Sequence, residues 1–529
     1  MQHDHPLTLQ HVLWRMRTMN ADRQVVTKTE EGADRISFGE LAKRVDRLAH
    51  ALTALGVGPG DRVATFSWNT QQHLELYLAV PCLGAVLHTL NIRLFPEQLT
   101  YIANHAQDRF LFADGSLADV LGPVEPTFET IERRIDTGDE YEALLAGAPD
   151  APFRWPDLDD RAAAGLCYTS GTTGNPKGVL YSHRSNMLHA IAKCLADAEA
   201  IRHGDRVLPV VPMFHANAWG FPYACALTGA DLVFPSRFVT PATLCGLIES
   251  ERVTLAAGVP TVWLDTLRYA DEHQPDLSSL RALVCGGSAV PESLIRAFDD
   301  RHGVRVVQAW GMTETSPLAS VSHAPPGAEG DAAFAARARQ GRPLPLVEQR
   351  IVGDDGSELP WDGEATGELE VRGPWIASDY YEDPAGPEKF HDGWLRTGDI
   401  ASIDAQGSIR LSDRSKDVIK SGGEWISSVD LENAIMAHPA VAECAVIAMP
   451  HERWAERPLA CVVLEPGQEV TPEALREHLA AHVAKWWLPD EVVYVDEVPK
   501  TSVGKFDKKA LRTRLADGRL LPQGTEVCG

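Results

Sequence analysis

The stretch Tyr168–Gly178 reads YTSGTTGNPKG and follows the apolar run AAGLC at 163–167. The six residues after the tyrosine are all glycine, serine or threonine, and a single lysine, Lys177, follows near the end. Glycines let backbone N–H groups converge on one point, and hydroxyl groups add donors, so such a loop can surround a phosphate. Pro176 replaces the glycine that a Walker A loop requires before its lysine. A mobile surface loop has a similar composition, but the spacing favours a phosphate-binding loop at the end of a buried strand.

Short apolar runs recur between Arg161 and Met312, and segments of helical length separate several of them. These runs are GLCYTS, RVLPVVPMF, ADLVFP, VTLAAGVP, RALVCGG and VRVVQAWG. Strands that alternate with helices predict parallel sheets covered on both faces, with ligand loops at the carboxyl ends of the strands. Earlier in the chain, Ser37 and Glu40 form a capping box for a helix predicted over 37–55, and RVATFSW predicts a buried strand after it.

The pattern changes in the C-terminal third of the chain. From Glu348 the predicted strands are shorter and are separated by Gly/Asp turns, whereas the stretch 325–340 predicts an exposed excursion. After Asp413, a helix over about 428–438, two strands, a second helix and a last strand predict a small α+β unit.

The length of 529 residues also favours more than one domain, because single cores stop growing near ~250–300 residues. We expect an α/β fold with a large multi-sheet N-terminal domain at 1–412 and a small mobile α+β C-terminal domain at 413–529.

The composition limits the kinds of partner and compartment. A formal net charge of −25 argues against general affinity for nucleic acid or for anionic membranes. The nine cysteines are scattered and form no C-x-x-C, which predicts reduced thiols in the cytoplasm. The N-terminus lacks the features of a signal peptide, and no apolar run approaches the ~18–20 residues of a membrane span. We therefore expect a cytoplasmic protein with no nucleic-acid partner and no integral membrane association.

Five motifs follow one another along the chain: YTSGTTGNPKGV at 168–179, WGMTETSP at 310–317, GWLRTGDI at 393–400, DRSKDVIKSGGEWIS at 413–427 and PKTSVGKFDKKALR at 499–512. Together they closely resemble the motifs of the adenylate-forming ligases, which include acyl- and aryl-CoA synthetases, luciferases and carrier-protein adenylation domains. The resemblance spans essentially the whole chain. It is strongest to medium- and long-chain fatty acyl-CoA synthetases, notably in VVPMFHANAWGFPY and SGGEWISSVDLENAIMAHP.

The resemblance implies a two-step reaction with ATP, Mg²⁺ and coenzyme A. A small-molecule carboxylic acid attacks the α-phosphate of ATP to give an acyl-adenylate, and the thiol of CoA then displaces AMP. Glu314 would be the Mg²⁺ ligand, which suits a cation that takes one or two carboxylate oxygens from the protein. Thr313 would donate to the α-phosphate, and Lys505 would bridge it to the substrate carboxylate. The outer phosphates would be cradled by Thr169, Ser170, Gly171, Thr172, Thr173, Gly174 and Lys177.

The resemblance also implies the residues that hold the nucleoside. Asp399 would accept hydrogen bonds from both ribose hydroxyls, and Arg414 would lie on the ribose or phosphate side. The adenine would lie along Gly287, Ser288 and Ala289, with Trp310 and Gly311 near the base. The glycine pair at 286–287 could instead form a simple turn at the end of a strand.

The second step implies a further set of residues. Lys416 matches the family's hinge, and Gly422, Gly423 and Trp425 would form one wall of the thiol tunnel. His215 would lie between the carboxylate and this tunnel, and Trp219 resembles the tryptophan that gates the acyl tunnel of long-chain members. Without the motifs, Lys505 would be interpreted as a solvated charge, His215 as a core histidine and the segment at Lys416 as a linker. Lys500 and Lys508 have no such support for catalysis.

Several alternatives stay open at this point. The acid could be aromatic, and the nucleophile could be a carrier-protein thiol or, as in diazotase-like offshoots of the family, nitrite. A non-catalytic nucleotide-binding protein and a homodimer are also compatible with the sequence. His478 and His482 lie four residues apart, but no third ligand indicates a metal site. The absence of G-x-S-x-G gives no support for a serine hydrolase.

Overall fold

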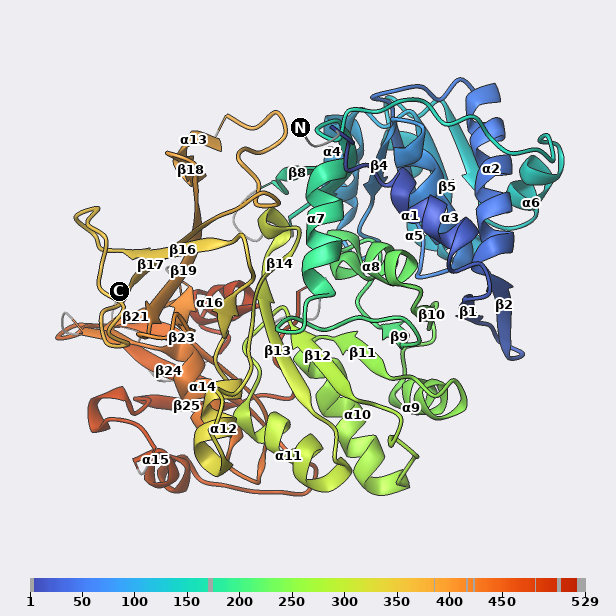
Figure 1. Ribbon diagram of the computed structural model, residues 1–529. Coiled ribbons are helices and arrows are strands. Elements are labelled where there is room, and N and C mark those ends of the chain that lie inside the picture. The colour runs from blue at the N-terminus through green and yellow to red at the C-terminus, as the bar shows by residue number, and fades with distance from the viewer. Residues whose placement is uncertain are drawn as a thin grey trace.

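The computed structural model describes residues 4–169, 175–384, 386–414, 417–421, 424–480, 482–501 and 506–520, apart from the side chains of Arg414, Glu424 and Trp425. These residues form a nine-stranded sheet, a six-stranded sheet and two five-stranded sheets. Figure 1 shows the C-terminal elements, drawn in orange and red, gathered on one side of the molecule.

The nine-stranded sheet has the order β15-β14-β13-β12-β11-β9-β10-β1-β2. Its strands from β13 to β1 are parallel, and the edge strands are antiparallel. Five of the six predicted apolar runs form its centre, and GLCYTS contributes to β7 of the six-stranded sheet, which confirms the alternation of strands and helices. The strands are β1 (Gln24–Lys28), β2 (Ala33–Ser37), β9 (Arg206–Pro209), β10 (Asp231–Phe234), β11 (Leu255–Gly258), β12 (Ala282–Gly286), β13 (Val306–Gly311), β14 (Leu318–Val321) and β15 (Arg342–Pro343). The helices between its strands are α8 (Phe221–Thr228), α9 (Pro241–Ser250), α10 (Pro260–His273) and α11 (Glu292–His302).

The six-stranded sheet has the order β6-β5-β3-β4-β7-β8 and is parallel except for the β7–β8 hairpin. Ser37 caps α2 by accepting a hydrogen bond from the Glu40 amide at 3.1 Å, as the capping box predicts. The strands are β3 (Arg62–Phe66), β4 (Val86–Thr89), β5 (Phe110–Ala113), β6 (Arg133–Asp136), β7 (Ala163–Tyr168) and β8 (Gly178–Ser182). Its neighbouring helices are α1 (Gln10–Thr18), α2 (Phe38–Ala54), α3 (Gln71–Cys82), α4 (Pro96–Ala106), α5 (Ala118–Leu121), α6 (Asp139–Ala146) and α7 (His183–Lys193).

One continuous apolar core joins these two sheets. Tyr77 of α3, Phe221 of α8 and Phe234 of β10 are all fully buried in it. The helices between the sheets therefore pack as a shared layer, and the loops at the strand ends are held in fixed positions relative to one another.

Two smaller sheets complete the fold. One contains β16 (Glu348–Val352), β17 (Gly367–Arg372), β18 (Phe390–His391), β19 (Trp394–Ile403) and β20 (Ile409–Arg414), with α13 (Gly386–Lys389) beside it. The other contains β21 (Ile419–Ser421), β22 (Glu424–Ile426), β23 (Val441–His451), β24 (Ala455–Leu464) and β25 (Glu491–Tyr494). It packs with α14 (Ser428–Met436), α15 (Pro472–Ala480) and α16 (Lys508–Ala516) around apolar cores of its own. The chain is thus a mixed α/β protein with a large multi-sheet N-terminal part and a smaller α+β C-terminal part, as the sequence predicts.

The stretch 325–340 corrects one prediction, because its second half is not an exposed excursion. It forms α12 (Gly330–Arg337), and the Arg337 guanidinium is buried in an ion pair with Asp299. Gln340 is also buried, and its side chain accepts a hydrogen bond from the Leu411 amide at 2.7 Å. The alanine- and arginine-rich composition concealed this packing, because an arginine can bury its stem and pair its charged end.

Two further expectations can be compared with the described residues. The eight cysteines among them form no disulfide. In that part of the chain, none of the helices is long and apolar enough to cross a membrane.

Candidate active site

The predicted phosphate loop lies between β7 and β8, in a hairpin rather than between a strand and a helix. The Thr169 amide donates to the Lys177 carbonyl oxygen at 2.9 Å, and the Lys177 amide donates to Thr169 Oγ1 at 3.0 Å. These two bonds close the base of the loop and hold Lys177 opposite Thr169. The predicted ligands Ser170, Gly171, Thr172, Thr173 and Gly174 lie outside the described residues.

Lys177, Tyr380 and Glu314 form what we call the Tyr380 cluster. The Lys177 ammonium lies 4.8 Å from the centre of the Tyr380 ring and 3.7 Å from Asp383 Oδ2. The Tyr380 hydroxyl donates to Glu314 Oε1 at 2.6 Å. Burial and the neighbouring Glu314 carboxylate raise the pKa of Tyr380 far above its ordinary value, so the hydroxyl keeps its proton. Tyr380 therefore links the predicted phosphate lysine to the predicted Mg²⁺ ligand.

The local fold of the GMTE motif brings Glu314 to this position. β13 ends at Gly311, and a short 3₁₀ turn follows at Thr313–Thr315. A Cβ atom at Gly311 would lie 1.7 Å from the Pro317 carbonyl oxygen, so only glycine fits there. The Thr313 carbonyl oxygen accepts from the Tyr181 hydroxyl at 2.7 Å, and the Glu314 carbonyl oxygen accepts from the Ala377 amide at 2.8 Å. The turn is thus fixed from two sides at the carboxyl end of β13.

The predicted nucleoside residues come together on neighbouring strands. Trp310 Nε1 donates to Asp399 Oδ2 at 3.0 Å, and both side chains are buried. Asp399 of β19 lies opposite Arg414 of β20 in the antiparallel register, which places the two predicted ribose residues side by side along the backbone. The predicted adenine segment, Gly287, Ser288 and Ala289, follows β12, which pairs with β13 next to Trp310. Gly287 has φ = +88°, a conformation that favours glycine at this strand end.

The predicted acid-binding residues lie in a turn with unusual backbone geometry. The five residues from Ala216 to Gly220 all have positive φ, between 42° and 78°. Each such non-glycine residue costs about 1–2 kcal/mol, and runs of this kind persist only where surrounding packing imposes them. Trp219 is buried, and its ring lies so close to β12 that a Cβ at Gly286 would be 3.4 Å from Trp219 Cη2. His215 is half-buried at the start of the turn. The turn therefore places Trp219 beside the strand end that carries the predicted adenine segment.

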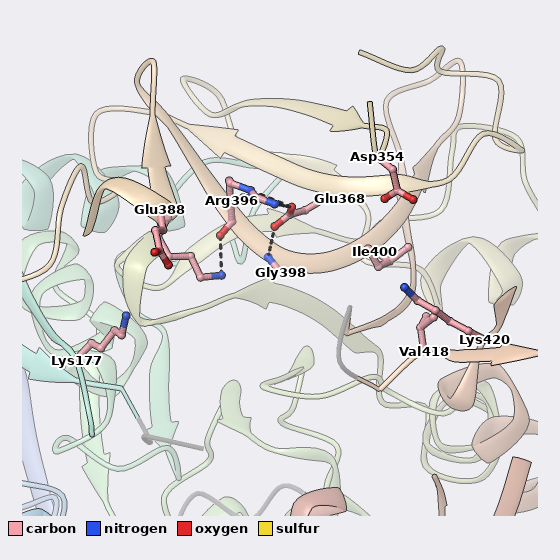
Figure 2. Close-up of a pocket in the computed structure, with 10 residues that line it drawn as sticks. Lys177, Asp354, Glu368, Glu388, Arg396, Gly398, Ile400, Val418 and Lys420 are labelled. Atoms are coloured by element: carbon pink, nitrogen blue, oxygen red, sulfur yellow. Dashed lines mark hydrogen bonds and ion pairs between the residues drawn. The ribbon is translucent and has the colours of Figure 1, made fainter. Parts of the chain in front are cut away.

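A cavity of about 440 Å³ adjoins the Tyr380 cluster and reaches the C-terminal part of the chain (Figure 2). Lys177 and Gly398 line it on one side, and Val418 and Lys420 line it on the other. Its wall contains the ion pair between Arg396 and Glu368. The cavity lies where a charged ligand could contact both parts of the protein.

The remaining predicted residues belong to the C-terminal segment. Lys416, Gly422, Gly423 and Lys505 lie outside the described residues. The backbone of Trp425 pairs with Lys420 in the β21–β22 hairpin. Lys420 lines the cavity, so the hairpin that carries the predicted tunnel motif lies next to it.

The donor set at Glu314 fits a magnesium ion that arrives with phosphate. Within the described ranges, no group of three or more His, Cys, Asp or Glu side chains is placed to hold a metal ion. Mg²⁺ needs no such group, because it commonly takes one or two protein carboxylates and completes its shell with phosphate and water. Glu314 supplies a buried carboxylate beside the phosphate loop, with Tyr380 bound to one of its two oxygens.

Sequence reasoning missed Tyr380. Its only signal was the aromatic pair in SDYYEDP at 378–384, which predicts a turn and gives no hint of a partner. Glu314 lies 66 residues away in the chain, so only the folded structure reveals the contact.

Known protein families and relatives match most of the length of this chain. The family model described as AMP-binding enzyme matches residues 14–381, and the model for the AMP-binding enzyme C-terminal domain matches 430–505. A 3-methylmercaptopropionyl-CoA ligase from Ruegeria pomeroyi is 46% identical over 505 residues, which cover 92% of this chain and 93% of the relative. A long-chain-fatty-acid–CoA ligase from Thermus thermophilus is 46% identical over 523 residues, covering 96% of each chain.

Two crystal structures of one relative allow a comparison of states. ATP-bound MatB from Rhodopseudomonas palustris matches with a TM-score of 0.85 and 27% identity, covering 97% of this chain and 100% of the relative. Apo MatB matches with a TM-score of 0.77 at the same identity and coverage. Since the sequence is the same in both comparisons, the present structure is closer in arrangement to the ATP-bound form of that relative. The matched family models and the near full-length relatives establish that this chain belongs to the AMP-binding enzyme family, as an acid–thiol ligase of the acyl-CoA synthetase type.

Proposed function

We propose that this protein uses ATP and Mg²⁺ to activate a medium- or long-chain fatty acid as its acyl-adenylate and then transfers the acyl group to CoA. The observation that carries the proposal is the convergence of Lys177, Tyr380 and Glu314 with the Trp310–Asp399 pair. The first three residues suit the phosphates of a nucleotide, and the pair suits its nucleoside. The Thermus thermophilus relative supports the choice of a long-chain acid, and the Ruegeria pomeroyi relative indicates that a shorter thioether acid belongs in the test.

In the first step, a carboxylate oxygen attacks the α-phosphorus of ATP, and the bond to the bridging oxygen of pyrophosphate breaks. The two reactants are both anionic, so positive charge at the reacting centre lowers the barrier. Lys177 and the hydroxyls of the 169–174 loop would hold the outer phosphates, and Thr313 would orient the α-phosphate. Glu314 would hold Mg²⁺, which supplies charge neutralisation for the leaving pyrophosphate. Lys505 would draw the carboxylate and the α-phosphate together.

In the second step, the CoA thiolate attacks the acyl carbon, and the bond to the phosphate oxygen of AMP breaks. The C-terminal domain, 413–529, would rotate about Lys416 relative to the N-terminal domain, 1–412, and thereby withdraw Lys505. Gly422, Gly423 and Trp425 would then border the thiol path, with His215 beside the acyl carbon. Trp219 would close the acyl site until the acid enters. The buried position of Trp219 supports this role. We propose that both steps take place in the cytoplasm, consistent with the absence of disulfides among the described cysteines.

Pyrophosphate release with ATP and Mg²⁺ across a panel of acids tests this function. The panel runs from short to long fatty acids and includes 3-methylmercaptopropionic, benzoic, aminobenzoic and cinnamic acids, each with and without CoA. We expect the highest CoA-dependent turnover with a medium- or long-chain acid, together with the acyl-CoA product. Turnover with an aryl acid that is insensitive to CoA would contradict the proposal. It would indicate a carrier-protein thiol or nitrite as the nucleophile.

A further inference from the structure

The first turn of α16 contains a largely buried lysine that the reaction outlined above does not use. Lys508 Nζ lies 2.8 Å from Glu432 Oε1 and donates to Ser428 Oγ at 2.5 Å. The Lys508 side chain is only 12% exposed, whereas its neighbour Lys509 is exposed. Burying a charged lysine is costly unless the lysine is paired. A lysine that served only to keep the surface soluble would be exposed, so the partners of Lys508 indicate a more specific role.

A chain of hydrogen bonds runs from Lys508 to β20, the strand that precedes the proposed hinge. Ser428 Oγ accepts a hydrogen bond from Lys508, and the Ser428 hydroxyl donates a hydrogen bond to Asp413 Oδ2 at 2.5 Å. The Ser428 amide also donates to Asp413 Oδ2, at 2.8 Å. Asp413 belongs to β20, whereas Ser428 and Lys508 belong to α14 and α16. We call Asp413, Ser428, Glu432 and Lys508 the α16 cluster.

The charges in the α16 cluster depend on one another. Burial alone would lower the pKa of Lys508, but the carboxylates of Glu432, Asp413 and Asp417 reverse this effect and raise it, so the ammonium stays charged. Burial raises the pKa of Glu432 to about 6 even though Lys508 opposes that shift. Removing Lys508 would leave two buried carboxylates without this cation.

The position of the cluster in the chain connects it to the proposed reaction. Asp413 lies just before the proposed hinge at Lys416, and Asp417 just after it pairs with Arg512 of α16 at 2.6 Å. The first half of α16 is therefore linked through Ser428 to Asp413 before the hinge, and it is paired directly with Asp417 after the hinge. Lys505 lies three residues before Lys508, a span of at most about 10 Å. The position of the start of α16 consequently limits the positions that Lys505 can reach.

We propose that Lys508 is a positioning residue for adenylation, which holds the start of α16 against Asp413 and so delivers Lys505 to the reacting phosphate. The inference rests on the proposed function of Lys505. The greater similarity of this structure to the ATP-bound form of MatB than to its apo form supports the assignment of these contacts to the adenylating arrangement. In the competing explanation, the cluster only stabilises the C-terminal part.

A double-mutant cycle separates these explanations. Adenylation is measured as single-turnover pyrophosphate release, and thiolation is measured from preformed acyl-adenylate, for Lys508→Met, Lys505→Ala and the double variant. We expect Lys508→Met to slow adenylation by about 100-fold, as a misplacement near 1 Å can do, and to change thiolation by less than about threefold. In the Lys505→Ala background, Lys508→Met should cause no further loss, because it acts through Lys505. The matched control is Lys509→Met, which should leave both steps unchanged.

Other outcomes are equally informative. Equal losses in both steps, or a full loss that persists in the Lys505→Ala background, would mean a purely structural role and would overturn the inference. Unchanged adenylation in Lys505→Ala would refute the proposed role of Lys505, and the inference would fail with it. If Lys508→Met does not fold, Ser428→Ala takes its place in the same cycle. This substitution removes the hydroxyl between Lys508 and Asp413 but keeps the Lys508–Glu432 ion pair. The outcomes that support or overturn the inference are the same as for Lys508→Met.

Discussion

The Tyr380 cluster and the α16 cluster both bury a carboxylate near a lysine, but they neutralise it differently. In the Tyr380 cluster, a neutral hydroxyl donates to Glu314, and no cation among the described residues forms an ion pair with this carboxylate. In the α16 cluster, Lys508 pairs with Glu432 directly. A buried carboxylate that lacks a bonded cation favours the binding of a cation from a ligand. A carboxylate that is already paired with a lysine can instead hold two helices or strands together. The first arrangement suits ligand binding, and the second suits the attachment of chain segments.

Glu314→Gln should produce the largest effect. The substitution keeps the volume and removes the charge that would hold Mg²⁺. We expect adenylation to fall by about 100- to 1000-fold, comparable to the loss of one group that stabilises the transition state. The measurement is pyrophosphate release as a function of Mg²⁺ concentration. Glu388→Gln, which changes an exposed carboxylate in the wall of the adjoining cavity, serves as the control. An unchanged Mg²⁺ dependence in Glu314→Gln would remove the distinction between the two clusters.

The α16 cluster should show a pH-dependent stability that reports its buried charge. The pKa of Glu432 is raised from 4.5 to about 6 in the folded protein, so the folded state binds more protons than the unfolded state between these values. The contribution of Glu432 to the free energy of unfolding should therefore decrease by about 2 kcal/mol as the pH rises from 4 to 7. Glu432→Gln should lack this component. Parallel denaturant unfolding curves of both proteins at each pH measure the difference, and a constant difference across this range would contradict the burial of an ionisable Glu432.

Tyr380→Phe should have a smaller effect on adenylation. The ring beneath Lys177 remains, but the hydrogen bond to Glu314 is lost. Since a hydrogen bond to a charged group contributes about 1.5–3 kcal/mol, we expect adenylation to slow by about tenfold or somewhat more. Mg²⁺ titrations of pyrophosphate release and the unfolding temperature are both measured. Tyr381→Phe is the matched control. A lower unfolding temperature with unchanged adenylation would mean that Tyr380 only packs.

Lys416→Pro should have the smallest effect and tests whether the α16 cluster belongs to a moving part. Proline fixes φ and restricts rotation at the proposed hinge. We expect thioester formation to slow by about fivefold and adenylation to change less, because only the second step needs the rotated arrangement. Separate measurement of the two half-reactions checks this. Equal rates in both steps would argue against a hinge at this residue.

Local patterns predicted most of the fold. Apolar runs bounded by glycine, proline and charged residues correspond to β9 through β13, because a strand buried on both faces has to be apolar throughout. The Ser37 cap and the start of α2 were equally clear. The helix α12 was missed, because Arg337 reads as a solvated residue until its partner Asp299 is brought to it by packing.

The residues of the candidate site were likewise predicted only in part. Ordered motifs predicted Glu314, Asp399 and Trp310, and the structure brings Trp310 and Asp399 into direct contact. Tyr380 and Lys508 carried no usable signal. The partners of Tyr380 and Lys508 lie 66 and 80 residues away in the chain.

The amino-acid order alone thus specified the fold class, the strand ends that carry the motifs and the kind of chemistry, because these depend on short-range periodicity and on residue types at close spacing. Only the tertiary structure decided which carboxylates are paired with a cation and which are bound by a neutral donor. That choice depends on burial and on contacts between distant segments. In the low-dielectric interior, these contacts determine whether a charge is left to attract a ligand or is used to hold two parts of the chain together.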